Sequence, residues 1–162
     1  MANNSKILLF LFTLLLYPIY YLHADPLPHG CEIKDFNYYN QNIVLNDTGQ
    51  QAFYLIQNHS NRSIRMQRIE TRNVFMSPPL TAKIDPMSWG AFASNISNFH
   101  FQCFILENEN LFPAACSTVI EICKYPRARF AQSNQGNYWV SINKSQQQVL
   151  NDAVSKGIYL KW

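Results

Sequence analysis

The sequence predicts a mainly β, disulfide-stabilised domain: an antiparallel immunoglobulin-like sandwich with one helix near the C-terminus. Three observations lead to this fold class. The β-favouring runs are short and closely spaced, turn residues separate them, and four cysteines follow an apolar N-terminal segment. Residues 25–162 show no internal repeat, no low-complexity tract and no linker. We therefore expect them to form a single domain.

The first 24 residues have the three-part organisation of a secretory signal peptide. A short polar start carries Lys6, residues 7–22 are apolar except for Thr13 and Pro18, and the small Ala24 precedes the expected cleavage point. The apolar stretch is shorter than the roughly 20 residues that a membrane span needs. Cleavage after Ala24 removes 24 of the 162 residues and leaves 138, placed in the periplasm or outside the cell. A retained N-terminal anchor is the alternative.

The expected strands follow one another with short polar breaks between them. They are residues 31–36, 43–45, 51–57, 63–69, 80–84, 89–93, 99–105, 119–125, 138–142 and 158–162. Residues 51–57 are apolar on both faces, as expected inside a sheet, and the turn residues that follow predict residues 63–69 as their hairpin partner. Two prolines precede residues 80–84, which suits an edge strand.

Residues 99–105 show the clearest alternation. Phe99, Phe101, Cys103 and Ile105 fall on one side of the strand, against the polar His100 and Gln102. This pattern places Cys103 on the core face.

The helix is expected to begin after Ser145. Ser145 and Gln148 fit a capping box, and Gly157 stands where a helix-ending glycine is favoured. An apolar stripe lies between these two signals. Its members are Val149, Leu150, Ala153 and Val154.

The four cysteines are expected to form two structural disulfides, because an exported chain matures where disulfides persist. They are Cys31, Cys103, Cys116 and Cys123. If the β-favouring residues 117–122 are extended, Cys116 and Cys123 lie about 23 Å apart. A disulfide tolerates a Cα separation of only about 5.5–6 Å. We therefore disfavour that bond, and we expect Cys31 and Cys103 each to bond to one of the later two cysteines.

The charge of the exported chain is nearly balanced. Loss of Lys6 leaves 12 basic side chains against 10 acidic ones, which is too mild an excess to indicate a nucleic-acid partner. Four arginines lie within residues 62–72, where a solvated strand and turn is the simpler interpretation and a basic patch for an acidic partner is the alternative. They are Arg62, Arg65, Arg68 and Arg72.

No sequence motif predicts catalysis, a metal or a cofactor. The chain lacks the Gly-x-Ser-x-Gly turn of serine hydrolases, and it has no Cys-x-x-Cys or His-x-x-x-His spacing for zinc. Five glycines form no phosphate-binding loop, and no particular pair of carboxylates is brought together for sugar hydrolysis. We expect a protein that is not an enzyme, with no cofactor and no metal ion.

Two segments are candidates for docking a protein partner, because interfaces favour exposed aromatic residues and arginines. The first contains Arg72, Phe75 and Met76, and the alternative is that its apolar side chains belong to the core. The second runs from Arg127 and Arg129 to Tyr138 and Trp139. Its alternative is a long connection whose aromatic residues pack inward.

Several segments resemble the enhanced-entry proteins of the EnhB type from intracellular Gram-negative bacteria such as Legionella. These are residues 25–31, the run Thr71-Arg72-Asn73-Val74-Phe75-Met76-Ser77-Pro78, the run Gly136-Asn137-Tyr138-Trp139-Val140-Ser141, and the tail from Asn143 to Trp162. The likeness covers nearly the whole of the exported chain. It implies an envelope or secreted protein whose presence favours entry into host cells, and it carries over no catalytic residue.

The sequence thus predicts a non-enzymatic exported protein-binding domain that supports bacterial entry into host cells. The expected partner is a protein of the bacterial envelope or of the host surface. The alternative is a periplasmic inhibitor or accessory factor of a cell-wall enzyme.

Overall fold

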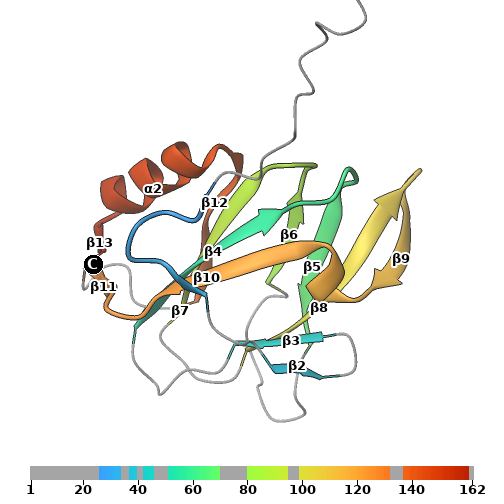
Figure 1. Cartoon of the computed structure of the whole chain (residues 1–162), viewed down its shortest axis with the longest axis horizontal. Helices are drawn as coiled ribbons and strands as arrows, with labels where there is room; N and C mark the ends of the chain where they lie inside the picture. Colours follow the sequence, from blue (N-terminus) through green and yellow to red (C-terminus); the bar gives the residue numbers. More distant parts are fainter. Residues whose placement is uncertain are drawn as a thin grey trace, which may run out of the picture.

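A computed structural model describes residues 26–33, 37–39, 42–45, 51–69, 80–94, 99–131 and 137–160. Two antiparallel sheets pack face to face, and a helix covers the other face of one of them (Figure 1). The prediction of a mainly β, antiparallel, disulfide-bonded fold with one C-terminal helix is confirmed. The two packed sheets are consistent with the immunoglobulin-like sandwich.

The first sheet, sheet A, lies in the middle of the molecule. Its strands, in spatial order, are β1 (Glu32–Ile33), β10 (Ile120–Tyr125), β4 (Ala52–Asn58), β7 (Trp89–Ser94) and β12 (Tyr138–Lys144). Every residue of β4 and β7 is buried. This burial confirms that residues 51–57 belong inside a sheet, where a strand can be apolar on both faces.

The second sheet, sheet B, covers one face of sheet A. Its strands, in spatial order, are β2 (Asn37–Tyr39), β3 (Asn42–Leu45), β8 (Phe99–Glu107), β5 (Ile64–Arg68) and β6 (Thr81–Ile84), with β9 (Asn110–Ala114) paired to the far part of β8. In β5, β6 and β8, buried side chains alternate with more exposed ones, as expected for a sheet with only one covered face. Strand β6 lies at the edge, as predicted.

A small third sheet and two helical segments complete the part of the fold that the structure describes. Strand β11 (Arg129–Phe130) pairs with β13 (Ile158–Tyr159), which follows helix α2 (Gln146–Ser155). A single 3-10 turn, η1 (Cys116–Thr118), precedes β10.

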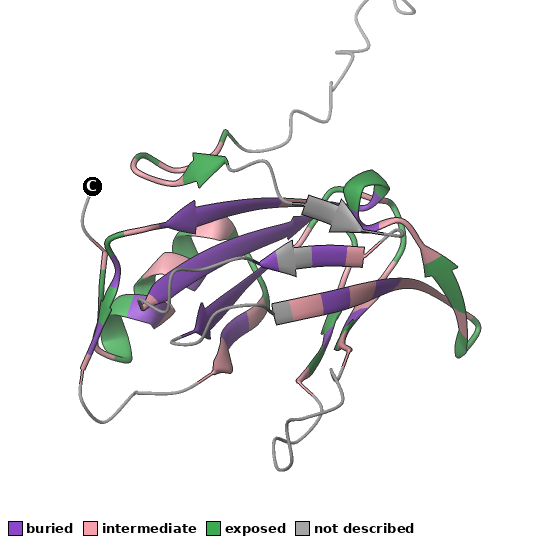
Figure 2. Cartoon of the chain, turned by 90° about the horizontal axis from the view of Figure 1, so that it is seen from below, coloured by how far each residue is buried: buried purple, intermediate pink, exposed green. Residues whose placement is uncertain are grey.

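Two hydrophobic clusters lie on opposite faces of sheet A. The cluster between the sheets contains Tyr54 and Phe92 from sheet A and Met66 and Phe101 from sheet B. The cluster on the other face contains Phe53, Trp89 and Tyr125 from sheet A, together with Val149 of α2. Figure 2 shows the resulting concentration of buried positions in the central strands. Sheet A is therefore the middle of three layers.

The disulfide prediction is confirmed. Cys31 bonds to Cys123 with Cα atoms 5.5 Å apart, and Cys103 bonds to Cys116 with Cα atoms 5.2 Å apart. Cys103 is wholly buried on the core face of β8, as the alternation predicted. The first bond ties the N-terminal segment to sheet A, and the second ties η1 to sheet B.

The predicted hairpin of residues 51–57 with residues 63–69 is wrong. Both edges of β4 are occupied, by β10 and β7, while β5 pairs with β6 and β8 in the other sheet. The turn between them therefore carries the chain from one sheet to the other. Asn58 stabilises this crossing, because its Nδ2 donates to the carbonyls of Arg62, Ile84 and Asp85 at 2.7, 3.0 and 3.1 Å.

Strand β9 was not predicted. Asn108 and Glu109 both have positive φ, 46° and 68°, and form a tight turn that folds β9 back onto β8. Pro113 within β9 is tolerated because β9 lies at the edge of its sheet. Residues 116–118 also differ from the extended run that the sequence suggested, since they form η1.

Candidate functional site

Helix α2 has two sides with different surroundings. Its start is set by the capping box, in which Ser145 Oγ accepts from the Gln148 backbone and the Gln148 side chain accepts from the Ser145 backbone. Its end is set by Gly157, whose φ is 74°. Val149 and Ala153 are buried against sheet A. Val154, expected inside the same stripe, instead has 64% of its surface exposed.

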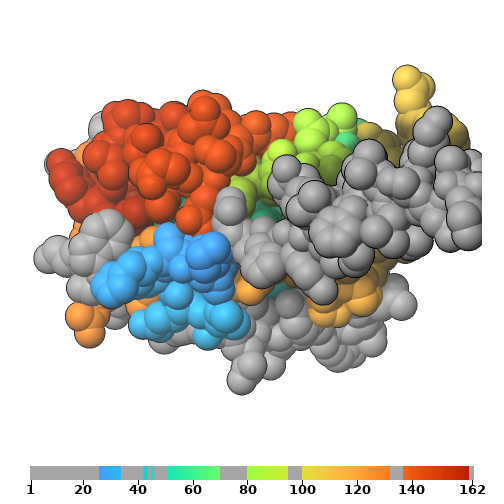
Figure 3. Space-filling view, turned by 45° about the horizontal axis from the view of Figure 1, so that its top comes forward, coloured from blue at the N-terminus to red at the C-terminus, as the bar shows by residue number. Residues whose placement is uncertain are grey.

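The N-terminal segment lies beside this helix. Space-filling atoms of residues 26–33, coloured blue, meet the red and orange atoms of the C-terminal elements on one face of the molecule (Figure 3). Gln146 Nε2 donates to the Pro26 carbonyl at 2.9 Å. The disulfide between Cys31 and Cys123 fixes the other end of the segment to β10.

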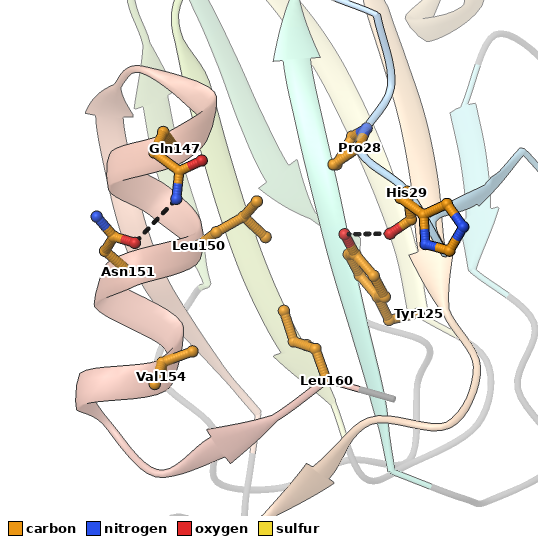
Figure 4. A pocket seen from close by; sticks show the side chains of 8 residues that line it. All are labelled: Pro28, His29, Tyr125, Gln147, Leu150, Asn151, Val154 and Leu160. Atoms are coloured by element: carbon orange, nitrogen blue, oxygen red, sulfur yellow. Dashed lines mark hydrogen bonds between the residues drawn. The ribbon is translucent and has the colours of Figure 1, made fainter. Parts of the chain in front are cut away.

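A hollow of about 500 Å³ opens between α2, the N-terminal segment and β10, and we call it the helix groove. Figure 4 shows the side chains that surround it. It is lined by Pro28, His29, Tyr125, Gln147, Leu150, Asn151, Val154 and Leu160. The described residues of the lining include no Asp, Glu, Lys or Arg, and the size of the hollow lies within the range of about 300–1,000 Å³ typical of ligand sites.

Tyr125 closes the inner wall of the helix groove. The residue is wholly buried, and its hydroxyl donates to the His29 carbonyl at 3.2 Å. Burial raises the pKa of the Tyr125 phenol to about 12. The phenol therefore stays neutral at any physiological pH, and this wall of the helix groove carries no charge.

Two side-chain amides lie on the helix side of the groove. Gln147 and Asn151 are one turn apart on α2, and Gln147 Nε2 donates to Asn151 Oδ1 at 3.0 Å. This bond uses one donor group and one acceptor group. Gln147 Oε1 and Asn151 Nδ2 take no part in this bond, and both residues are exposed.

A second polar cluster fixes α2 to sheet A. Asp152 Oδ2 accepts from Lys144 Nζ at 2.8 Å and from Ser141 Oγ at 2.6 Å. The hydrogen bond from Lys144, followed by that from Ser141, lowers the pKa of the Asp152 carboxyl. Lys156 Nζ donates to the Val140 carbonyl. These contacts to β12 hold the helix in place as one side of the helix groove.

The second predicted docking segment divides between surface and core. Arg127 and Arg129 are exposed, and Arg129 Nη1 donates to the Ala128 carbonyl at 2.9 Å. Tyr138 and Trp139 are partly buried and pack against different clusters. The Trp139 ring lies 5.3 Å from Phe92 and 6.0 Å from Phe101, between centroids. The segment therefore offers its arginines to a partner more readily than its aromatic rings.

The first predicted docking segment, with Arg72, Phe75 and Met76, lies outside the described residues, as do residues 1–24. Among the other clustered arginines, Arg62 is exposed and forms an ion pair with Glu107.

The sequence did not single out the helix groove. Its walls come from three separate places, residues 28–29, Tyr125 and the stretch 147–160. One signal was available, because a disulfide at Cys31 fixes the end of the N-terminal segment to another part of the chain. The exposure of Val154 was not visible in a helical pattern that counts it with the buried stripe.

In the described ranges, no helix is long and apolar enough to cross a membrane. Within the same ranges, no three His, Cys, Asp or Glu side chains come together in a way that would hold a metal ion. Comparison of the chain with protein-family models, with curated proteins and with solved structures found no match.

Proposed function

We propose that this protein is an exported, non-enzymatic binding domain that takes up a partner protein at the helix groove and thereby supports bacterial entry into host cells. The groove supports binding, and the resemblance to the EnhB type supports the link to entry. Two disulfides and the signal-like N-terminus support a periplasmic or extracellular location.

The observation that carries the proposal is a hollow with an apolar wall left open at the surface. Val154 lines this hollow and has 64% of its own surface exposed, although the neighbouring Val149 and Ala153 are buried. Exposed apolar side chains that line a concave surface beside a few polar groups are typical of binding sites.

Crosslinking from the groove itself tests the proposal. Val154 is replaced by a photoreactive benzophenone side chain, and Met87, an exposed apolar residue in the turn between β6 and β7, is replaced in the same way as the matched control. Cells that produce each variant are irradiated before and during contact with host cells. Adducts are identified by mass spectrometry, and each captured protein is then purified and tested for binding to the unlabelled chain.

We expect one dominant adduct at position 154 that is absent at position 87, and purified partner that binds the parent chain but not Val154→Glu. A host-surface partner would mean direct recognition at entry. A bacterial envelope partner would favour the alternative role as an accessory factor or inhibitor of a cell-wall enzyme. Identical adducts at both positions, or none, would contradict binding at the helix groove.

The arginine surface of Arg127 and Arg129 is the rival docking site. A double Arg127→Ala, Arg129→Ala variant removes both charges from exposed positions and should leave the fold intact. Loss of the purified partner's binding in this variant, with binding retained in Val154→Glu, would move the partner from the helix groove to the arginine surface.

A further inference from the structure

We infer that the Cys31–Cys123 disulfide is a redox-sensitive device that controls the helix groove. A dithiol reduces this bond ahead of Cys103–Cys116, the N-terminal segment then leaves sheet A, and the groove loses one of its walls. Because the controlled site is the helix groove, the inference rests on the proposed function. Three observations lead to it: the position of the N-terminal segment, the contacts that hold it, and the difference in exposure between the two disulfides.

The N-terminal segment, residues 26–33, forms one wall of the helix groove. Pro28 and His29 line the groove on this side, and the side chains of α2 line the opposite side (Figure 4). The His29 carbonyl accepts from the Tyr125 hydroxyl, and Leu27 packs partly buried against the cluster on this face of sheet A. Movement of the segment away from sheet A would therefore remove this wall and break the bond between His29 and Tyr125.

The pairing of the N-terminal segment with sheet A is short. Strand β1 contributes only two residues to it, and the second of them, Ile33, has 67% of its surface exposed. At the other end of the segment, the Pro26 carbonyl accepts from Gln146 Nε2 of α2. Ordering eight residues costs conformational entropy, and the disulfide limits this cost by keeping an opened segment close to β10. Without the bond, the open state is populated more.

The two disulfides differ in how far a thiol can reach them. Cys103, Cys116 and Cys123 are wholly buried, whereas Cys31 keeps part of its surface exposed. Exchange with a disulfide requires that a thiolate reach one of its two sulfurs, so the rate depends on access. Cys103 and Cys116 both belong to the cluster between the two sheets, so the sandwich must open before their bond is attacked. Cys31 therefore offers the point of attack in the folded protein.

The reductant is a protein with two neighbouring thiols, present in the envelope or on the host surface. One of its thiolates attacks Cys31 Sγ and forms a mixed disulfide, while Cys123 leaves as a thiolate and takes a proton from water. The second thiolate of the reductant then attacks the reductant's own sulfur in that mixed disulfide, and Cys31 leaves and is protonated in the same way. The protein has gained two electrons and two thiols, and the reductant has become a disulfide. An oxidised protein of the same class reverses both steps.

The test uses the purified, disulfide-bonded protein without denaturant. It is incubated with increasing concentrations of dithiothreitol, or of a reduced thioredoxin-like protein, and free thiols are blocked with N-ethylmaleimide and located by mass spectrometry. Hydrogen exchange and circular dichroism are measured on the same samples. A variant with both Cys31→Ser and Cys123→Ser represents the reduced state. A variant with both Cys103→Ser and Cys116→Ser is the matched control that keeps the other bond.

We expect Cys31 and Cys123 to be labelled at least about tenfold faster than Cys103 and Cys116. After this first reduction, the amides of residues 27–33 should exchange at least about tenfold faster, while β4 and β7 keep their protection. The Cys31→Ser, Cys123→Ser variant should show the same fast exchange of this segment without any reductant. The matched control should keep the segment protected until the reductant is added.

Two results would overturn the inference. The first is equal labelling rates for the two disulfides. The second is exchange of residues 27–33 that reduction leaves unchanged, or that rises only together with exchange of β4 and β7, since the bond would then support the whole fold and control no single segment.

Photocrosslinking from position 154 distinguishes this inference from the proposed function. If both hold, the Cys31→Ser, Cys123→Ser variant should lose most of the adduct, because the groove has lost a wall. Release of the segment on reduction with no adduct at position 154 in the parent chain would keep the redox device and remove the proposed function. An adduct at position 154 with no release of the segment would remove the redox device and keep the proposed function.

Discussion

Replacement of Asn58 by alanine is expected to lower the free energy of unfolding by about 3 kcal/mol. Asn58 is wholly buried at the end of β4, where the chain crosses from sheet A to sheet B. Its Nδ2 donates to three carbonyls, and its Oδ1 accepts from the backbone N and the Oγ of Ser60 at 3.0 and 2.6 Å. One side chain thus joins the ends of β4 and β6 to the turn before β5.

The size of this destabilisation depends on which hydrogen bonds the partners of Asn58 keep after the substitution. The Arg62 carbonyl keeps Ser60 Oγ at 2.9 Å, and the Asp85 carbonyl keeps the Ser88 N–H at 3.1 Å. The Ser60 N–H and the Ile84 carbonyl lose their bonds to Asn58, at about 1.5 kcal/mol each. With a urea m-value of about 1.5 kcal/mol per molar, a loss of about 3 kcal/mol moves the unfolding midpoint by about 2 M.

Urea unfolding followed by tryptophan fluorescence measures this shift. Asn58→Asp is the decisive companion, because it keeps the size of the side chain but turns an oxygen toward the three carbonyls. It should destabilise at least as much as alanine. The exposed Asn61→Ala in the same turn is the control and should move the midpoint little. A near-normal midpoint for Asn58→Asp would show that the residue acts through its volume and not through its donors.

Three further predictions concern the disulfides, α2 and the groove wall. Removal of the Cys31–Cys123 disulfide should lower the free energy of unfolding by about 4.6 kcal/mol, and removal of Cys103–Cys116 by about 3 kcal/mol, because their sequence separations are 92 and 13. Loss of Cys31–Cys123 should also weaken binding at the helix groove. Equal losses of stability in thermal unfolding would argue against this chain-entropy account. Because the pKa of Asp152 is lowered, its contribution to folding stability is present above its ordinary pKa and disappears as the pH falls. The urea midpoints of the parent and Asp152→Asn should therefore differ at about pH 7 and converge at about pH 3. A difference that stays constant with pH would contradict this contribution. Because the pKa of Tyr125 is raised, its contribution to folding stability is present below about pH 10 and is lost toward about pH 12. In a titration followed by tyrosinate absorbance, Tyr125→Phe should lack one phenol that titrates late.

Local signals in the sequence predicted several elements correctly. The capping box at Ser145 and the glycine at 157 set the ends of α2, because both act through neighbours within one turn of the chain. The alternation around Cys103 set the inward face of β8, since successive side chains of a strand point to opposite faces. The extended length of residues between Cys116 and Cys123 was enough to exclude their bond, even though residues 116–118 form a turn.

Strand pairing was harder to predict from the sequence. A turn after residues 51–57 predicts a hairpin when the next strand has a free edge to join, but β10 and β7 occupy both edges of β4. The sequence does not distinguish Asn58 from any other turn residue. Only its position between the sheets gives its amide three carbonyl partners. Strand β9 depended on positive φ at Asn108 and Glu109, which residue type favours only weakly.

The fold class follows from local patterns, because the strand and helix periods, the caps of α2 and the inward face of Cys103 are all properties of short stretches of chain. The tertiary structure decided which strands pair, which cysteines bond, and where the helix groove lies. The groove brings together Pro28, Tyr125 and Val154, residues from three distant parts of the chain. No local pattern encodes such a meeting, because it depends on how the strands pair and pack.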